Sequence, residues 1–175
     1  MRIERQFTSH TESSKVDAAY DGMTFHESAS EIRNPDGTLV FSMPKVEVPN
    51  TWSQVATDII AQKYFRKAGI PAALKKVAEK DVPEFLWRAE PDEKALAKLP
   101  EDQRFGPEHS AKQVFDRLAG TWAYWGWKGG YFDREEDARA YFDEMRRMLA
   151  EQMAAPNSRS EERRVGKECR YRWSP

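Results

Sequence analysis

Prolines punctuate the middle of this sequence so closely that they limit what it can fold into. They recur at intervals of seven to nine residues, at Pro83, Pro91, Pro100 and Pro107. A proline in a helix interior removes a backbone donor, clashes with the preceding turn and costs about 3 kcal/mol. We therefore predict no long helix here. Asp92–Leu99 should supply one or two helical turns, and the rest should be a connecting loop that can wrap over a neighbouring surface.

A β-hairpin is predicted on the N-terminal side of this segment. The turn sequence Asn34-Pro35-Asp36-Gly37 combines a proline that presets φ with a glycine that accepts a positive φ. It separates two strand-like stretches, 23–33 and 38–48. Pro44 and Pro49 cannot donate to a central ladder, so the second strand should be an edge or interrupted. Residues 1–22 show no sustained period and are predicted to be a flexible leader.

A helical texture follows the hairpin. Asn50 or Thr51 can cap a helix whose apolar residues continue through Tyr64, and Gly69 followed by Pro71 ends it. Residues 72–80 continue this helical pattern as a second segment, which is short and basic.

The strongest amphipathic helix is predicted after Ser110, its N-cap. Its apolar stripe consists of Val114, Leu118, Trp122 and Trp125, widened by Phe115 and Ala119. Glycines in 126–130 should end it. Asp133, with Glu136 three residues on, should cap a last helix that runs to Ala155-Pro156. The buried face of that helix should be Ala138, Tyr141, Phe142, Met145, Met148 and Leu149.

These patterns predict a mainly α fold. An N-terminal β-hairpin (23–48) should be followed by a helical part (50–155) of three to five helices with a proline-rich connecting loop.

The last 17 residues, Arg159–Pro175, do not continue this texture. Arg159 to Cys169 corresponds codon by codon to the translation of a short-read sequencing adapter, so we predict that 159–175 is a non-native tail and that the natural protein is cut near Ser158. The other interpretation is a basic, disordered tail that binds nucleic acid or an acidic partner.

Without the tail, the charge balance becomes acidic. Residues 1–158 hold 22 basic and 26 acidic residues, a net charge of −4, and no cysteine, because Cys169 is in the tail. This balance gives no reason to expect binding to a nucleic-acid polymer or an anionic membrane. A body without thiols forms no disulfide and carries no thiolate nucleophile. No apolar run approaches a membrane span and no signal peptide is recognisable, so a cytoplasmic location is expected.

The residues suggest no self-contained catalytic or metal site. His10, His26 and His109 lack the spacing of a helical metal site. Gly129-Gly130 lacks the further glycines of a phosphate-binding loop and should close a turn. Tryptophans 122, 125 and 127 could stack on bases or sugars, but helical spacing favours core packing.

Pro156-Asn157-Ser158 is different, because it begins a loop directly after a helix. Its side chains can hydrogen-bond phosphate or ribose oxygens, although the same residues could simply stop the helix.

Four stretches, taken together and in this order, carry a resemblance. They are SEIRNPDG at 30–37, VPNTWSQVA at 48–56, AQKYFRKAG at 61–69 and SAKQVFDRLAGTW at 110–122. The sequence resembles the N-terminal region of adenosylcobalamin-dependent (class II) ribonucleotide reductases over nearly all of 1–158.

The resemblance implies a parent enzyme that reduces ribonucleotides, usually diphosphates, to deoxyribonucleotides. In that family, homolysis of the cobalt–carbon bond of adenosylcobalamin generates a thiyl radical on a barrel cysteine, and a thioredoxin-like protein re-reduces a cysteine pair. Ser158 matches the family's substrate-contacting loop residue. Arg159 stands where the family has Pro-Gln-Trp-Phe-Asn leading into a ten-stranded barrel. The catalytic cysteines and most of the cobalamin site would lie beyond it, so the fragment alone should be inactive.

The alternative function is a stand-alone interaction module that uses the Trp-rich helix face. A reductase fragment should leave the stripe Val114, Leu118, Trp122 and Trp125 partly uncovered, whereas a module should bury it or match it to one partner.

Overall fold

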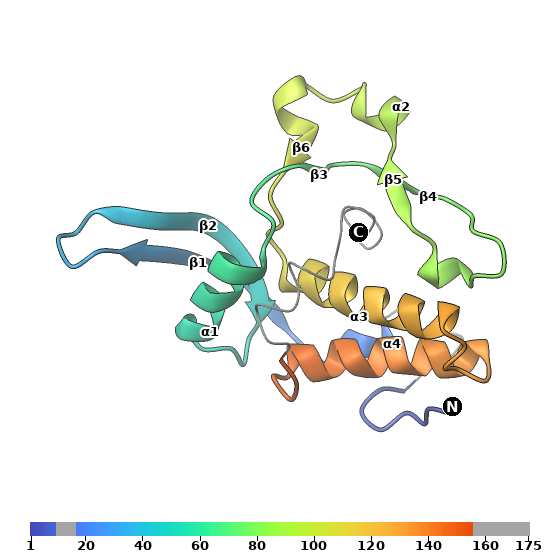
Figure 1. Ribbon diagram of the computed structural model, residues 1–175. Coiled ribbons are helices and arrows are strands. Elements are labelled where there is room, and N and C mark those ends of the chain that lie inside the picture. Colours follow the sequence, from blue (N-terminus) through green and yellow to red (C-terminus); the bar gives the residue numbers. More distant parts are fainter. Residues whose placement is uncertain (10–16, 156–175) are drawn as a thin grey trace.

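The computed structural model describes residues 1–9 and 17–155, and it arranges them in three parts (Figure 1). A two-stranded arm projects from one side. A layer of two long helices, α3 and α4, forms the body. A lobe of short elements from the proline-rich segment lies beyond α3, on the side away from α4. In the part of the chain that is described, no helix is long and apolar enough to span a bilayer.

The arm is the predicted β-hairpin. Strand β1 (Phe25–Arg33) pairs antiparallel with β2 (Leu39–Pro49), from Phe25 opposite Pro49 to Arg33 opposite Leu39. The turn closes with a hydrogen bond from Asn34 N to Thr38 O of 2.9 Å, and Gly37 takes a φ of +85°. Proline at the second turn position and glycine at the fourth therefore do what the sequence predicts.

The predicted interruption of the second strand is a β-bulge. Ser28 pairs with Val46 and Ser30 pairs with Met43, so Pro44 and Lys45 together face a single residue of β1. The bulge accommodates Pro44, because an unpaired position needs no backbone donor.

Helix α1 (Gln54–Ile59) starts later and ends sooner than predicted. Its N-cap is Ser53, whose Oγ accepts from Ala56 N at 3.2 Å. Asn50 does not cap the helix because its backbone N donates to Thr24 O and its side chain contacts His26. One π-helical turn, Ile60–Tyr64, follows α1, and the helical conformation stops at Phe65.

The proline-rich segment contains no long helix, as predicted. Its one short helix is α2 (Glu93–Leu96), capped by Asp92. Two 3₁₀ turns, Glu84–Leu86 and Glu101–Gln103, lie on either side of it.

The prediction of helical texture at 72–80 is wrong. Strand β4 (Leu74–Lys76) pairs there with β5 (Ala89–Pro91), and Val77 N donates to Arg88 O. Strand β3 (Ile70–Pro71) pairs likewise with β6 (Phe105–Gly106). The proline-rich segment provides backbone partners from 11 or more residues away, and these outweigh a weak local preference for helix.

Helix α3 (Ala111–Lys128) begins at Ser110 as predicted. A capping box forms there: Ser110 Oγ accepts from Lys112 N, and Gln113 Oε1 accepts from Ser110 N at 3.0 Å. The helix ends within 126–130, as predicted, although Gly126 itself is still helical. Its end is at Gly129, and Gly130, with a φ of +67°, closes the turn.

Helix α4 (Glu135–Ala150) is not capped by Asp133, which corrects the second capping prediction. Its N-cap is Arg134, which makes no side-chain capping bond. The carboxylate of Asp133 instead accepts from the Met1 amino group at 2.5 Å. Asp133 therefore bonds the distant Met1 amino group instead of the backbone N–H groups at the start of α4.

Helices α3 and α4 pack side by side over two apolar clusters. The larger cluster joins them to the base of the arm and to the π-helical turn, through Val46, Val48, Ile60, Val114, Phe115, Leu118 and Leu149. The smaller cluster joins them to the lobe, through Val82, Leu86, Ala119, Ala123 and Phe142. The predicted apolar face of α4 is buried at Ala138, Phe142 and Leu149 and half-buried at its other members.

Residues 1–8, within the predicted leader, lie along α4, and we call them the N-terminal strap. Ile3 N donates to Asp137 Oδ1 at 3.1 Å, and Arg5 pairs with Asp143 at 2.8 Å. Phe7 N and Thr8 N both donate to Glu144. The strap covers a row of α4 carboxylates, and the sequence pattern did not indicate these contacts.

Candidate functional site

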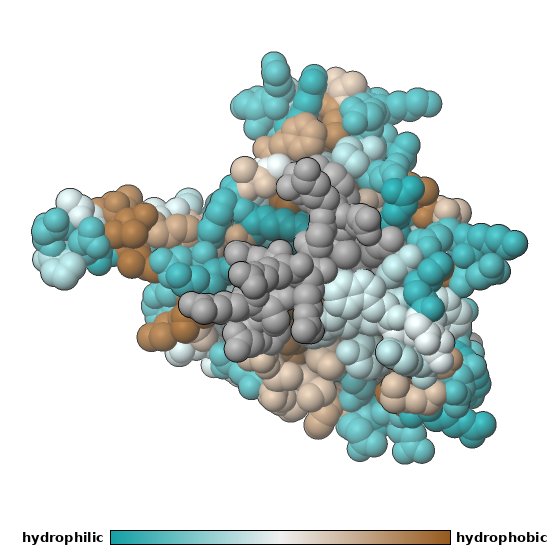
Figure 2. Space-filling view, in the orientation of Figure 1, coloured by the Kyte–Doolittle hydropathy of each residue, from teal (hydrophilic) through white to brown (hydrophobic). Residues whose placement is uncertain are grey.

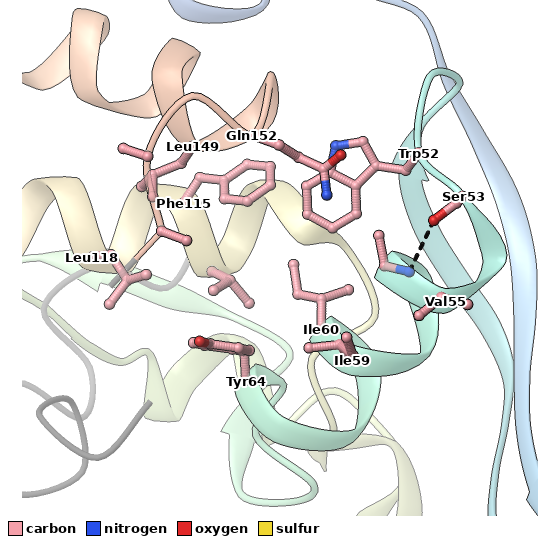
Figure 3. A pocket seen from close by; sticks show the side chains of 14 residues that line it. Trp52, Ser53, Val55, Ile59, Ile60, Tyr64, Phe115, Leu118, Leu149 and Gln152 are labelled. Atoms are coloured by element: carbon pink, nitrogen blue, oxygen red, sulfur yellow. Dashed lines mark hydrogen bonds between the residues drawn. The ribbon is translucent and has the colours of Figure 1, made fainter. Parts of the chain in front are cut away.

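An apolar groove opens where α4 ends, between α1, α3 and the last described residues (Figure 3). Its volume is about 310 Å³, at the lower end of the range of small-molecule pockets. Helix α3 supplies Val114, Phe115 and Leu118, and α4 supplies Leu149. The opposite wall comes from 52–64, with Trp52, Val55, Ala56, Ile59, Ile60 and Tyr64.

Trp52 fixes the two ends of the groove to each other. Its indole Nε1 donates to Ala150 O, the last residue of α4, at 2.7 Å. Its ring lies 5.8 Å from that of Phe115, at an interplanar angle of 58°. The N–H of a tryptophan that is half-buried still needs a partner, and Trp52 finds one at a helix end, where carbonyls are unpaired within the helix. The start of α1 is thereby tied to the end of α4.

The π-helical turn shapes the second wall. Phe65 N donates to Ile60 O at 3.1 Å, a bond across five residues. A wider turn rotates the residues that follow relative to a regular α-helix, and such turns occur frequently at functional sites. Here it places Ile60 and Tyr64 on the same side as Ile59 (Figure 3).

The end of α4 forms the rim of the groove. Met153 N donates to Met148 O at 2.8 Å and Gln152 N to Leu149 O at 3.2 Å, the two bonds of a Schellman motif. Gln152 takes the left-handed position of that motif, with a φ of +59°. The chain reverses there, so that Gln152, Ala154 and Ala155 line the groove.

The groove offers apolar contact and few polar groups. The hydroxyl of Ser53 already caps α1, as the dashed line in Figure 3 shows. The indole N–H of Trp52 is bonded to Ala150. The groove can thus hold an apolar group, but it presents no acid–base pair or nucleophile with which to transform one.

A second hollow, of about 520 Å³, lies between the base of the arm and the start of α3. Glu47 accepts there from Lys112 Nζ at 2.8 Å and from Ser110 Oγ at 2.5 Å. Burial acts to raise the pKa of Glu47, but these hydrogen bonds and the charge of Lys112 outweigh it, and the pKa is lowered. The carboxylate is therefore already satisfied by the protein.

A buried charge network continues from this hollow into α4. Arg146 bonds both oxygens of Asp17 at 2.7 Å, and also Asp143 at 2.7 Å and Asp116 at 3.1 Å. Tyr20 donates to Asp116 at 2.9 Å. Burial is the main cause that raises the pKa of both Tyr20 and Asp116. Because its groups bond one another, we assign this network to structure.

The sequence-predicted substrate residue, Ser158, lies outside the described residues, as do Pro156 and Asn157. The structure does place their starting point, since Ala155 lines the groove. His26 contacts Asn50 Oδ1 at 3.0 Å, and His109 is an exposed residue before α3. Among the residues described, no three His, Cys, Asp or Glu side chains gather as metal ligands would.

The Trp-rich stripe of α3 is covered at one end and open at the other. Val114 and Leu118 are each 2% exposed, Trp122 is half-buried and Trp125 is 38% exposed. The indole N–H of Trp127 donates to Asp81 O, which ties α3 to the lobe. Core packing therefore accounts for most of the stripe.

Sequence reasoning missed the groove and the exposed pair Val55 and Ile59 on its rim. The sequence of 52–64 does contain a signal for this apolar surface, because it has more apolar residues than one face of so short a helix can bury.

Comparison with known proteins decides the family. A family model described as class II vitamin B12-dependent ribonucleotide reductase matches residues 26–152. The chain belongs to this family. It corresponds to the N-terminal region of these reductases, and the match runs from β1 through the turn that ends α4.

Three curated relatives carry the description vitamin B12-dependent ribonucleotide reductase. Those from Bradyrhizobium diazoefficiens and Agrobacterium fabrum are each 61% identical over 158 residues, 90% of this chain. The one from Rhodopirellula baltica is 27% identical over 130 residues, 74% of this chain. The chain spans only 12% of the length of the first two reductases and 9% of the third.

Proposed function

We propose that this chain is the N-terminal region of an enzyme that reduces ribonucleoside diphosphates to deoxyribonucleotides. In the full-length protein it serves as a helical platform, and α4 delivers the polypeptide to a substrate-contacting loop that begins at Ser158. One observation carries the proposal: α4, the last helix of the matched region, ends at Ala150 beside the groove, eight residues before Ser158.

The described residues do not fit a cobalamin site of their own. The lining of the groove is mostly apolar, and two of its polar groups, the Trp52 indole N–H and the Ser53 hydroxyl, bond within the protein. His26, a possible cobalt ligand by chemistry, is engaged with Asn50. We therefore assign adenosylcobalamin, the radical cysteine and the contact with a thioredoxin-like reductant to the rest of the full-length polypeptide, and no step of the reaction to residues 1–155.

Residues 159–175 have no part in this function in our proposal. The two relatives at 61% identity align over 158 residues, which is also the number of residues before Arg159. Sequencing the genomic locus across the Ser158 codon tests this directly. We expect the reading frame to continue into a barrel-encoding region instead of into the codons for Arg159–Pro175.

Steady-state kinetics of the full-length protein test the function. We expect turnover of a ribonucleoside diphosphate only when adenosylcobalamin and a dithiol reductant are both added. Ser158→Ala should raise KM about two- to tenfold, since one hydrogen bond to the substrate is worth roughly 0.5–1.5 kcal/mol. Ser42→Ala, at an exposed position of the arm, is the matched control and should leave KM unchanged.

Two results would contradict the proposal. Absence of turnover with every ribonucleotide would remove the assigned activity. An unchanged KM and kcat in Ser158→Ala would remove the substrate contact while leaving the platform role intact.

The alternative, a stand-alone interaction module that uses the Trp-rich face, has less support. That face is occupied by the protein's own core at Val114 and Leu118. Val55 and Ile59 of α1, beside the groove, are 68% and 51% exposed, more than Trp125 at 38%, which suits a region that packs against more of its own polypeptide.

A further inference from the structure

We propose that the hollow between the base of the arm and the start of α3 binds an uncharged small molecule that carries an amide edge, a C=O beside an N–H, on an apolar body. The side-chain amide of Gln113 donates to the C=O of this ligand, and the carboxylate of Asp116 accepts from its N–H. The hollow shares no lining residue with the groove at the end of α4. The site therefore adds a ligand to the proposed function and does not depend on it.

Gln113 has a hydrogen-bond donor that the protein leaves unused. Its Oε1 accepts from His109 N at 2.9 Å and from Ser110 N at 3.0 Å, and two backbone donors on one atom fix which end of the amide is the oxygen. Gln113 is only 8% exposed, yet among the described residues no group accepts from its Nε2. The residue lines the hollow. Because a donor withdrawn from water costs free energy unless it is bonded, this one indicates a ligand with an acceptor.

Asp116 supplies the complementary acceptor. Tyr20 Oη and Arg146 Nη1 both donate to its Oδ1, at 2.9 and 3.1 Å. In the part of the chain that is described, no group donates to its Oδ2, and 27% of the side chain is exposed. Residues three apart adjoin on a helix surface, and Gln113 and Asp116 both line the hollow. A free donor and a free acceptor thus lie side by side, which matches the two halves of an amide edge.

The charges around the hollow favour an uncharged ligand. Asp17, Glu47 and Asp116 line it, and Lys112 is the lysine among them. Lys112 already pairs with Glu47 at 2.8 Å, and Arg146 is shared between Asp17 and Asp116. A phosphate or carboxylate would therefore meet a net negative lining. The volume of about 520 Å³ lies within the range of small-molecule pockets, roughly 300–1,000 Å³.

Aromatic side chains form the apolar part of the hollow. The ring of Phe25 meets that of Tyr20 edge to face, with 5.6 Å between the centroids and an interplanar angle of 85°. Lys112 Nζ lies 4.0 Å from the centroid of Phe25, and Met23 completes this side. These side chains can pack against the apolar body of a ligand whose amide edge faces α3.

Fluorine NMR relaxation of para-fluorobenzamide, titrated with the full-length protein, tests the site. The matched probes are para-fluoroacetophenone, which lacks the N–H, and para-fluorobenzoate, which is an anion. We expect the acetophenone to bind about two- to tenfold more weakly than the benzamide, because one hydrogen bond is missing, and the benzoate to bind least. The acetophenone also reports apolar binding elsewhere, such as at the brown patch on the arm in Figure 2, where Leu39 and Val40 are 53% and 54% exposed.

Two variants locate the binding. Gln113→Glu keeps the acceptor that caps α3, because glutamate also forms a capping box, but it replaces the free donor with an anionic oxygen. Asp116→Asn keeps one acceptor for Tyr20 and Arg146 and replaces the free oxygen with a donor. Each should weaken the binding of para-fluorobenzamide about tenfold. Gln103→Glu makes the same charge change at an exposed position of the lobe and should leave this binding unchanged.

Three results would overturn the proposal: no binding of para-fluorobenzamide, equal binding of the acetophenone, or unchanged binding in Gln113→Glu. The comparison of probes uses the unmodified protein, so it decides the question even where a variant fails to fold. Displacement of the probe by nicotinamide would assign the ligand to the carboxamides, and displacement by uridine to the nucleobases. Displacement by neither would refute recognition of an amide edge. Ribonucleotide turnover is not measured, so failure of the proposed function would leave these results standing.

Discussion

Arg117 and Glu108 form an ion pair almost withdrawn from solvent, with 8% and 1% of their side-chain surfaces exposed and 3.2 Å between Nε and Oε1. The pair does more than join two charges. Glu108 Oε2 also accepts from Arg66 N at 2.8 Å, and Arg117 Nη2 donates to Tyr64 O at 3.0 Å. It therefore holds the π-helical turn against α3 and so positions one wall of the groove.

Removing the carboxylate of this pair should be costly. Glu108→Ala leaves the Arg117 guanidinium buried without its counter-ion, and we expect it to lower the free energy of unfolding by about 3–5 kcal/mol. Urea denaturation followed by tryptophan fluorescence measures this loss. Glu90→Ala is the control, since Glu90 pairs with Arg88 at the surface with 38% and 46% of the side chains exposed, and should cost less than about 1 kcal/mol. Equal losses in the two variants would show that the Arg117–Glu108 pair is not a structural anchor.

Gly126 lies inside α3 because Phe132 occupies the space that a side chain would need. A Cβ at position 126 would lie 2.6 Å from Phe132 Cε2. Gly126→Ala should thus destabilise the protein by about 1–2 kcal/mol, despite the better helix propensity of alanine. In a Phe132→Ala background the same change should become stabilising, by up to about 1 kcal/mol. A double-mutant cycle by thermal or urea denaturation measures the coupling, and additive effects would refute the steric explanation.

Gln152 has a left-handed backbone conformation that glycine adopts at less cost. Gln152→Gly should therefore raise the free energy of unfolding by about 0.5–1 kcal/mol. Gln62→Gly, within the π-helical turn, should lower it by a similar amount because glycine loses more backbone entropy there. Chemical denaturation of both variants checks the opposite signs. Two changes of the same sign would mean that the side chain of Gln152 matters more than its backbone.

The N-terminal strap should detach in acid. Burial acts to raise the pKa of Glu144, but hydrogen bonds from Thr8 and Phe7 outweigh it, so its pKa lies below the ordinary 4.5. The bond from Arg134, followed by that from Ile3 N, lowers the pKa of Asp137 below 3.8. A carboxylate with a lowered pKa stabilises the bound strap fully above its unfolded value and loses that effect as the pH falls through the folded pKa.

Amide hydrogen exchange, corrected for the intrinsic pH dependence of the rate, measures this detachment. Protection of the Phe7 and Thr8 amides should be full near neutrality and fall once the pH drops below about 4.5. Glu144→Gln should already lack much of that protection near neutrality, whereas Glu136→Gln, at an exposed position on α4, should behave like the unmodified protein. Protection independent of pH would show that packing, not charge, retains the strap.

Local signals predicted the elements whose determinants are local. The hairpin turn at Asn34–Gly37, the N-cap at Ser110 and the short helix after Asp92 all depend on residues within four positions of one another. Predictions failed where a distant partner competed. Asp133 had the sequence of a cap but binds the amino group of Met1, and residues 72–80 pair with a strand that the proline pattern concealed.

The groove and the buried charges of α4 could not be inferred from spacing. The groove joins side chains from 52–64, 114–118 and 149–155, and only the packed structure brings these together. Asp143 and Arg146 occupy what periodicity marks as the polar face of α4, yet they are only 1% and 4% exposed. The strap and residues 17–20 cover these two side chains. Because the sequence of the leader has no periodicity, it does not indicate that the leader packs on α4.

The contact between the strap and α4 has a consequence for the order in which the protein is made. The strap binds a helix more than 130 positions later in the chain, so its binding surface does not exist until most of this region has been translated. Contacts of such sequence separation form late and slow the search for the native state. Until α4 has been translated, Arg5, Phe7 and Thr8 cannot make these contacts. Formation of the contacts would therefore mark the completion of this region on the ribosome.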